Sequence, residues 1–331
     1  MTRLEVLMPT YRHAAYVEQA IDSVLAQRTN DVEVILLISD DGSDDGTQDI
    51  IRRYAQRYPE RILTRFVDPA TKQHDSTDPL PGRATLIAHY RWASAEYIGL
   101  LEGDDYWIDE HKVQVQVDHL RAHPEQSFCF TNAYNEYDGA RRVDYVRSWL
   151  KGRTPEAVLG QRDVVAANFI PTAGVVYRRA CFPEIPEAFH TVAALDWILY
   201  IALSEHGDFG FLDRFSAVRR VHEGGVISMK PLLEKIERNF HLLDRIDVMT
   251  HERWTDLLND RRVDLARMAL KEAEAKGDVE AGLDYLQRIT DTPSWRSRMS
   301  TKERIHHTLT FRYPGLHRWL KKALGSRYAV P

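Results

Sequence analysis

The sequence is poor in cysteine and has no long hydrophobic run. It holds two cysteines, Cys129 and Cys181, among 331 residues, too few for a disulfide framework or a thiolate zinc site. The longest apolar stretch, residues 32–38, contains a glutamate and is far shorter than the ~18–20 apolar residues of a membrane-spanning helix. These absences predict a cytoplasmic protein with lone thiols and without a transmembrane segment.

Outside the C-terminal end of the chain, acidic side chains outnumber basic ones. Lys and Arg number 44 against 49 Asp and Glu, which gives a net charge of −5. Residues 296–331 contain nine of the basic side chains and one acid, so this segment carries +8 and the rest of the chain −13. An acidic body argues against nucleic acid as a partner, and the basic tail indicates a separate local role for that segment.

Strand-like and helix-like segments alternate through the first part of the chain. We expect strands at residues 4–8, 33–38, 62–67 and 97–101, and helices at residues 14–27, directly after residue 46, and at residues 83–95. Such alternation is typical of βαβ units, so we predict an α/β fold with a mostly parallel central sheet flanked by helices. Ligands bind beyond the carboxyl ends of the strands in sheets of this kind.

The alternation becomes irregular beyond residue 130. Short strands at residues 128–131 and 174–177 and a helix at residues 196–203 still fit an α/β domain. From residue 231 to about residue 287 the pattern is helical and charged. We therefore predict three parts, namely an α/β domain at residues 1–230, a helical region at residues 231–295 and a basic amphipathic tail at residues 296–331.

Two acidic clusters come directly after predicted strands, at residues 40–46 and 102–105. Because both follow strand ends, we expect them to face the same crevice. Adjacent carboxylates repel one another, and a hard divalent cation such as Mg²⁺ or Mn²⁺ relieves that repulsion. The first cluster also suits a helix cap, so ligand binding and capping both stay open for it.

Four ordered motifs resemble those of the family 2 glycosyltransferases of GT-A fold. They are residues 6–12 (VLMPTYR), 20–27 (AIDSVLAQ), 40–47 (DDGSDDGT) and 102–105 (EGDD). Residues 195–197 (LDW) and 219–228 (RRVHEGGVIS) extend the resemblance to about residue 228. The resemblance implies transfer of a sugar from a nucleotide-diphospho-sugar, with a UDP-sugar favoured, to an acceptor hydroxyl on a glycan or lipid-linked saccharide, with inversion at the anomeric carbon.

The resemblance also assigns the donor site by position. The residues it implies for nucleotide binding are Pro9, Thr10, Tyr11, Arg12, Asp40, Arg83, Asp104 and Arg220. Among these, Asp40 matches the carboxylate that contacts the base, and Arg220 would neutralise the departing diphosphate. A solvated strand end is the alternative for Arg220 and its neighbour Arg219.

A divalent metal is implied at Asp104, Asp105 and His222, and an imidazole ligand favours Mn²⁺ over Mg²⁺. Glu102 stands where the family pattern more often has aspartate. Asp196 matches the general base, which removes the acceptor's proton on the face opposite the leaving group. A helix cap is the alternative for Asp196, and Leu195 before it stands where the family commonly has an acid.

On the acceptor side we expect Trp107 and Thr172, with core packing as the alternative for each. Residues 68–82, rich in proline and aspartate, are a candidate lid over the donor. In the tail, aromatic residues and leucines alternate with Lys and Arg, which suits an anionic membrane surface or a partner subunit. The expected location is the cytoplasm, with the tail on the inner face of the cell membrane.

Two other functions fit the same α/β pattern. A sugar nucleotidyltransferase would carry a basic, glycine-rich loop after the first strand, where this chain has Pro9 to Arg12. A nucleotide-sugar-binding protein of the same fold without turnover is the second alternative, supported by Leu195 and Glu102. The donor sugar, the acceptor and the oligomeric state stay open.

Overall fold

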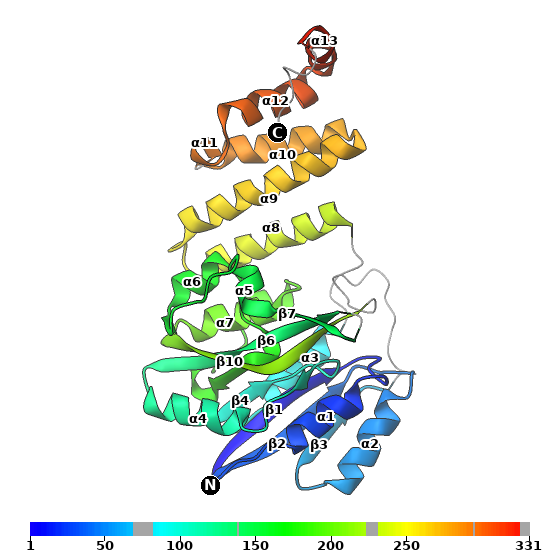
Figure 1. The fold of residues 1–331 in the computed structure, drawn as a ribbon, viewed down its shortest axis with the longest axis vertical. Helices are drawn as coiled ribbons and strands as arrows, with labels where there is room; N and C mark the ends of the chain where they lie inside the picture. Colours follow the sequence, from blue (N-terminus) through cyan, green and yellow to red (C-terminus); the bar gives the residue numbers. More distant parts are fainter. Residues whose placement is uncertain (69–81, 138, 223–230, 294, 325–331) are drawn as a thin grey trace. The chain divides into compact units, whose positions relative to one another are not determined.

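The computed structural model describes residues 1–68, 82–137, 139–222, 231–293 and 295–324. The chain divides into two compact units, Met1–Gly225 and Val226–Pro331, shown in Figure 1. The predicted boundary at residue 230 falls outside the described residues, as does almost all of the predicted lid at residues 68–82. The separation of a tail at residue 295 stays a prediction.

The first unit consists of a central sheet with helices packed against it (Figure 1). Its strands are β1 (Thr2–Thr10), β2 (Val32–Asp40), β3 (Ile62–Phe66), β4 (Tyr97–Leu100), β5 (Tyr106–Trp107), β6 (Gln126–Tyr137), β7 (Arg141–Asp144), β8 (Val158–Leu159), β9 (Val175–Arg178) and β10 (Asp208–Val221). Its α-helices are α1 (Val17–Leu25), α2 (Thr47–Arg57), α3 (Arg83–Trp92), α4 (Lys112–Ala122), α5 (Tyr145–Trp149), α6 (Gln161–Ala166) and α7 (Leu195–Leu203). Three single-turn 3₁₀ helices are η1 (Thr172–Gly174), η2 (Arg179–Cys181) and η3 (Glu187–His190).

The strand order in the sheet is β3-β2-β1-β4-β9-β6-β10-β5, with β7 beside β6 and β8 beside β10. Strands β1 to β4 are mutually parallel where they pair, and β6 is parallel to β10. The antiparallel strand β9 lies between these two blocks. The predicted mostly parallel sheet is confirmed, with β9 joining its two parallel parts.

The centre of the sheet is apolar on both faces. Leu4, Val6 and Met8 of β1 and Ile38 of β2 are completely buried, as parallel strands covered by helices require. In β1 and β2 the register pairs Thr10 with Asp40, so both motifs end at the same edge of the sheet. The edge at the carboxyl ends of β1, β2 and β4 is therefore where the first two acidic motifs meet.

Strand β10 is the largest element that the sequence pattern does not predict. It pairs with β6 along most of its length, but the register shifts between Leu212 and Phe215 and again between Phe215 and Ala217. Such bulges break the period of two by which a strand is recognised. As a result, Arg219 and Arg220 lie within a sheet strand rather than in a loop.

The second unit is helical throughout its described residues. Its helices are α8 (Leu232–Met249), α9 (Thr255–Lys276), α10 (Val279–Asp291), α11 (Trp295–Arg298), α12 (Thr301–Arg312) and α13 (Pro314–Leu324). Ile236, Leu270, Tyr285 and Phe311 belong to its own hydrophobic core. Among the residues that the structure describes, no helix combines the length and the apolar character needed to cross a membrane.

Candidate functional site

The turn after β1 and the loop after β2 are held together by Asp40. Its carboxylate is completely buried and accepts hydrogen bonds from Thr10 Oγ1 (2.8 Å), Ser43 N (2.8 Å), Ser43 Oγ (2.6 Å) and Gln48 Nε2 (2.7 Å). Each carboxylate oxygen thus has two donors from the protein itself. Asp40 therefore fixes the shape of this edge of the site, and it is poorly placed to offer an oxygen to a ligand.

Removing the Asp40 carboxylate is expected to destabilise the first unit strongly. In Asp40→Ala, three buried polar partners lose their acceptor, which should lower the free energy of unfolding by about 3–5 kcal/mol. Urea denaturation measures this loss, with Asp44→Ala as the matched control, because Asp44 is an exposed acid of the same loop. A similarly small effect of both substitutions would contradict the structural role of Asp40.

Asp41 is the partly exposed carboxylate at this strand end. Its Oδ1 accepts a hydrogen bond from Thr85 Oγ1 (2.6 Å) at the start of α3, and a Cβ atom at Gly82 would lie 3.0 Å from its Oδ2. Two adjacent strand-end acids point to opposite sides, so only one of them is turned into the core. Of the two acids, Asp40 is the one turned into the core, and Asp41 is partly exposed at the strand end.

Arg12 closes the turn after β1 in an unusual backbone conformation. Its φ of 55° lies in the left-handed region, which a residue other than glycine adopts at a cost in energy. The amide of Arg12 donates to Ser43 Oγ (2.8 Å), and its guanidinium forms two hydrogen bonds of 2.8 Å with Asp44. Tyr11 lies beside it, with the guanidinium 5.5 Å from the ring centroid.

The second acidic motif lies directly against the turn after β1. The Gly103 amide donates to the carbonyl of Pro9 (3.1 Å). A Cβ atom at Gly103 would come within 2.5 Å of Thr10 Cγ2 and 2.9 Å of His13 Nδ1. Glycine at this position therefore allows the donor-side turn and the acidic motif to touch.

Two histidines flank the carboxylate of Asp104. Its Oδ2 lies 3.1 Å from His222 Nε2 and 3.7 Å from His13 Nε2. Burial lowers the pKa of His13, although the charge of Asp104 acts to raise it. The lowered pKa favours a neutral imidazole. His222 was expected here from its motif, whereas His13 follows the first motif and no spacing in the sequence indicates its approach to Asp104.

Asp105 and Glu102 lie beside Asp104 in a desolvated environment. Asp105 is 5% exposed, and its Oδ1 accepts the amide of Arg220 (2.9 Å). Burial, with the charges of Asp104 and Glu102, raises the pKa of Asp105 well above its ordinary value. Burial and Asp104 likewise raise the pKa of Glu102 to about 7, and Glu102 Oε2 is buried without a hydrogen-bond partner in the described residues.

These carboxylates and imidazoles have the donor chemistry of a divalent-cation site, while no three of their donor atoms lie within 4.8 Å of one another in the described residues. Three clustered carboxyl groups raise one another's pKa because their negative charges repel, and a cation removes that repulsion. Carboxylate oxygens with imidazole nitrogen at their side are a donor set for Mn²⁺ and similar ions. Asp104 with His222 is the centre of this candidate site, and Asp105 and His13 border it.

The neighbouring arginines of β10 face different surroundings. The side chain of Arg220 donates to the carbonyl of Asp104 and to Gln19, and it lies 4.4 Å from the ring centroid of Tyr106. Arg219 is exposed, and its positive charge lowers the pKa of Asp196 and of Asp105. Arg220 thus braces the acidic motif, while the guanidinium of Arg219 donates to Asn135 Oδ1 (3.3 Å), and its charge only counteracts the rise in the pKa of the two carboxyl groups. The remainder of their motif, residues 223–228, lies outside the described residues.

Asp196 is the second residue of α7, and its side chain is held by Asn168. Its Oδ2 accepts a hydrogen bond from Asn168 Nδ2 (2.9 Å). Burial raises the pKa of Asp196, while the bond from Asn168, the amide of Trp197 and the charge of Arg219 act in the opposite direction. The charge of Asp196 also raises the pKa of Glu102, so α7 brings this carboxylate to the acidic motif.

Arg83 and Thr172 lie around the same region. The guanidinium of Arg83 donates to the carbonyl of Val192, which ties the start of α3 to the segment before α7. Thr172 opens η1, is partly exposed and lies beside Tyr200 of α7. Both assignments stay predictions.

The expectation that Trp107 contacts an acceptor is wrong. Its side chain is 4% exposed, its Nε1 donates to the carbonyl of Ala173 (2.8 Å), and Lys112 Nζ lies 4.4 Å from the ring centroid. The indole packs in the core because α4 and η1 cover it, so no ring face is open to a sugar. The alternative of core packing holds for this residue.

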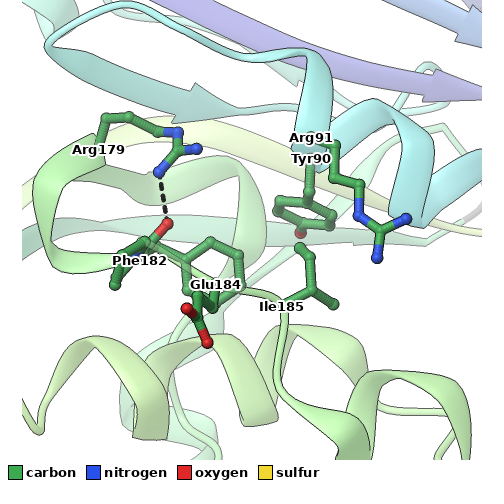
Figure 2. A pocket seen from close by; sticks show the side chains of 7 residues that line it. Tyr90, Arg91, Arg179, Phe182, Glu184 and Ile185 are labelled. Carbon is green, nitrogen blue, oxygen red and sulfur yellow. Dashed lines mark hydrogen bonds between the residues drawn. The ribbon is translucent and has the colours of Figure 1, made fainter.

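A cavity of about 370 Å³ lies elsewhere in the first unit (Figure 2). Its lining residues are Tyr90, Arg91, Arg179, Phe182, Pro183, Glu184 and Ile185. Arg179 follows Arg178, which pairs with Tyr97 at the amino end of β4, whereas the acidic motif follows the carboxyl end. The cavity therefore contains none of the residues assigned from the sequence and is not the candidate donor site.

Comparison with sequence families gives a match over residues 5–68 to the model described as glycosyl transferase family 2. An uncharacterized protein of Mycobacterium tuberculosis is 34% identical over 232 residues, which cover 67% of this chain and 60% of that protein. The chain thus spans well under two thirds of the length of this relative. The same identity and coverage apply to an uncharacterized protein of Mycobacterium bovis.

Two solved structures are similar over nearly the whole chain. TarS of S. aureus in complex with UDP-GlcNAc has a TM-score of 0.64 at 15% identity, covering 98% of this chain and 92% of that one. The mannosyltransferase PcManGT of Pyrobaculum calidifontis, in complex with GDP-Man and Mn²⁺, has a TM-score of 0.52 at 17% identity, covering 96% and 88%. At these identities the likeness concerns the fold, and the predicted fold class is confirmed.

Proposed function

We propose that this chain, which carries a family 2 glycosyltransferase domain of the GT-A fold, transfers a sugar from a nucleoside diphosphate donor to an acceptor hydroxyl. The acceptor class we propose is a glycan or a lipid-linked saccharide. The observation that carries the proposal is the contact of Asp104 with His222 at the carboxyl edge of the sheet, beside Glu102, whose pKa the charge of Asp196 helps to raise. UDP-sugars are the favoured donors, in keeping with the UDP-GlcNAc bound by TarS.

The nucleoside would lie against the turn of residues 9–12. Tyr11 and Arg12 border this surface, and Asp41 supplies the accessible carboxylate for hydrogen bonds from a base. The buried carboxylate of Asp40 fixes the shape of this surface through its four hydrogen bonds. Arg83 approaches from α3 and is the candidate contact to base or phosphate.

The diphosphate would lie over the acidic motif. Asp104 and His222 would hold a divalent cation, with Asp105 beside them, and Mn²⁺ is favoured because of the imidazole. When bound, such an ion neutralises the charge that develops on the leaving diphosphate. Arg219 would supply a second positive charge from the protein itself, because it is exposed and its charge acts on Asp105. Arg220 keeps the motif in place through the Asp104 carbonyl.

Asp196 is the proposed general base of a single, inverting displacement. Its raised pKa makes its carboxylate a better proton acceptor than that of an exposed aspartate. It takes the proton of the acceptor hydroxyl as the hydroxyl oxygen attacks the anomeric carbon. Asn168 is the proposed positioning residue, because its amide fixes one oxygen of the Asp196 carboxylate.

A donor survey tests the proposed function. The purified chain is incubated with UDP-GlcNAc, UDP-glucose, UDP-galactose, GDP-mannose and a dTDP-sugar, each with Mn²⁺, and release of the nucleoside diphosphate is measured. We expect slow hydrolysis of at least one UDP-sugar, abolished by chelation of the metal. Hydrolysis of none of them would contradict the proposal, whereas release from GDP-mannose alone would move the donor assignment from UDP to GDP.

We further propose that the basic tail places the enzyme on an anionic membrane surface, at the inner face of the cell membrane. Exposed apolar side chains gather on α12 and α13, with Ile305, Tyr313, Leu316 and Trp319 between 47% and 63% exposed. Arg312 and Arg318 are exposed beside them. Interfacial helices combine apolar and basic side chains in this manner.

Binding to vesicles should depend on Trp319 and on the lipid charge. Trp319→Ala is expected to weaken binding to phosphatidylcholine–phosphatidylglycerol vesicles about ten-fold, because a buried indole contributes more than 1 kcal/mol. Co-sedimentation measures the binding. Trp149→Ala is the matched control, since Trp149 of the first unit is 54% exposed. Equal binding to neutral vesicles, or equal loss in both variants, would contradict the membrane role and favour a partner subunit.

A further inference from the structure

Three side chains of the second unit have the donor atoms and spacing of a metal site. One ligand atom each from Glu274, His306 and His307 lie within 4.8 Å of one another, and no other such group is found in the described residues. The carboxylate comes from α9 and both imidazoles from α12. This group belongs to the second unit and plays no part in the proposed transfer reaction.

Ion pairs hold α9 and α12 in position for these side chains. Arg267 of α9 pairs with Glu303 of α12 (2.5 Å). Arg267 precedes Glu274 by two helical turns, and Glu303 precedes His307 by one turn, so each pair shares a helix face. The same two faces therefore carry the ion pair and the group of Glu274, His306 and His307. The fold thus keeps the three donor atoms within 4.8 Å of one another.

His307 is buried and His306 is partly exposed, and the hydrogen-bonding capacity of both imidazoles is incompletely used. His307 is 5% exposed, and its Nδ1 is buried without a hydrogen-bond partner in the described residues. His306 Nε2 contacts both oxygens of Glu274, at 2.9 and 3.1 Å. The ring of His317 of α13 lies 5.2 Å from that of His306, centroid to centroid. A buried imidazole nitrogen without a partner is costly unless something binds there.

We propose that Glu274, His306 and His307 form a binding site for Zn²⁺ in the second unit. Two imidazoles and one carboxylate are a donor set typical of zinc. Tetrahedral ligands about 2.0–2.2 Å from zinc lie about 3.3–3.5 Å from one another, so the present contact between His306 and Glu274 needs to open by only a few tenths of an ångström. The ion takes the place of the proton between His306 Nε2 and Glu274. That proton moves to His306 Nδ1 or to solvent.

The consequence is a cross-link between α9 and α12. Both helices contribute to the hydrophobic core of the second unit, through Leu270 and Phe311 among others. A ligand that binds only the folded form stabilises it by mass action. Zinc should therefore stabilise the fold of the second unit, independently of any sugar donor.

The test uses the full-length chain without a histidine tag, in an Asp104→Asn background that removes the candidate cation site of the first unit. Co²⁺ is titrated and its visible absorption recorded, and Zn²⁺ is then added as competitor. We expect one equivalent of Co²⁺ with the intense absorption of a tetrahedral site, displaced by one equivalent of Zn²⁺. Zn²⁺ should also raise the melting temperature by at least about 5 °C.

Variants separate this site from adventitious binding. His307→Gln and Glu274→Gln should each weaken Zn²⁺ binding at least ten-fold, and His251→Asn, a change at an exposed histidine of the same unit, should leave it unchanged. Circular dichroism shows whether each variant folds. The proposal is overturned if the parent chain gives no displaceable Co²⁺ absorption, or if a folded His307→Gln or Glu274→Gln variant binds zinc as the parent does. Neither result bears on the sugar-transfer proposal, which concerns the first unit.

Discussion

Asp196→Asn is expected to lower kcat for sugar transfer about a thousand-fold while leaving the affinity for the nucleotide nearly unchanged. The amide cannot accept the proton of the acceptor hydroxyl, and general-base catalysis is worth about 10²–10⁴ in rate. Asparagine has nearly the size and shape of aspartate and keeps one side-chain oxygen, so it can still accept the hydrogen bond from Asn168. Nucleoside diphosphate release measures kcat, and calorimetry measures the affinity for UDP.

The matched control is Asp256→Asn, because Asp256 also lies in the first turn of a helix, α9, but in the other unit. It should have the activity of the parent chain. Equal, measurable activity of Asp196→Asn and the parent would instead favour a capping role for Asp196. Nucleotide binding without turnover in both proteins would favour the alternative of a binding protein.

The pH profile adds a readout that a structural role would not change. The base works as the carboxylate, so kcat should fall as the pH falls through the raised pKa of Asp196. The hydrogen bond from Asn168 lowers this pKa, so Asn168→Ala should raise it and move the acid limb of the profile to higher pH. An acid limb that stays in place would show that Asn168 does not act through Asp196.

Asp104→Asn is expected to reduce kcat/KM by at least about a hundred-fold and to remove most of its dependence on Mn²⁺. The neutral amide is a weak ligand, and the change also removes the charge between His222 and His13. Steady-state kinetics at a series of Mn²⁺ concentrations measure both effects. Asp118→Asn, at an exposed acid of α4, is the control and should keep the activity and metal dependence of the parent. Unchanged metal dependence in Asp104→Asn would contradict the assignment of the cation site.

The sequence pattern was sufficient to predict the parallel part of the sheet and the edge at which the motifs meet. Apolar runs followed by Asp40 and by Glu102 mark the carboxyl ends of β2 and β4, the two strands that flank β1, and parallel strands bring such ends to one edge. The placement of His222 beside Asp104 also agrees with the expectation from its motif. These features depend on local pattern and on strand direction, and both are encoded in short stretches of sequence.

Other features depend on packing between distant segments and could not be inferred from local pattern. Which of Asp40 and Asp41 faces inward is decided by the pairing of Thr10 with Asp40 across the sheet. Trp107 is buried because the carbonyl of Ala173, far along the chain, accepts its indole N–H. His13 approaches Asp104 because the glycine between Glu102 and Asp104 permits that contact. The bulges in β10 interrupt the alternation of side chains, so the strand that carries Arg219 could not be predicted from the sequence pattern.

The most direct test of the account is calorimetric titration of the chain with UDP, in the presence and absence of Mn²⁺. The account predicts micromolar binding that requires the metal, because Asp104 and His222 would bind the diphosphate through the cation. If UDP does not bind with the metal present, GDP and dTDP are titrated in turn, since the choice of base is then wrong. Failure of all three nucleotides to bind would contradict the assignment of a donor site at the carboxyl edge of the sheet.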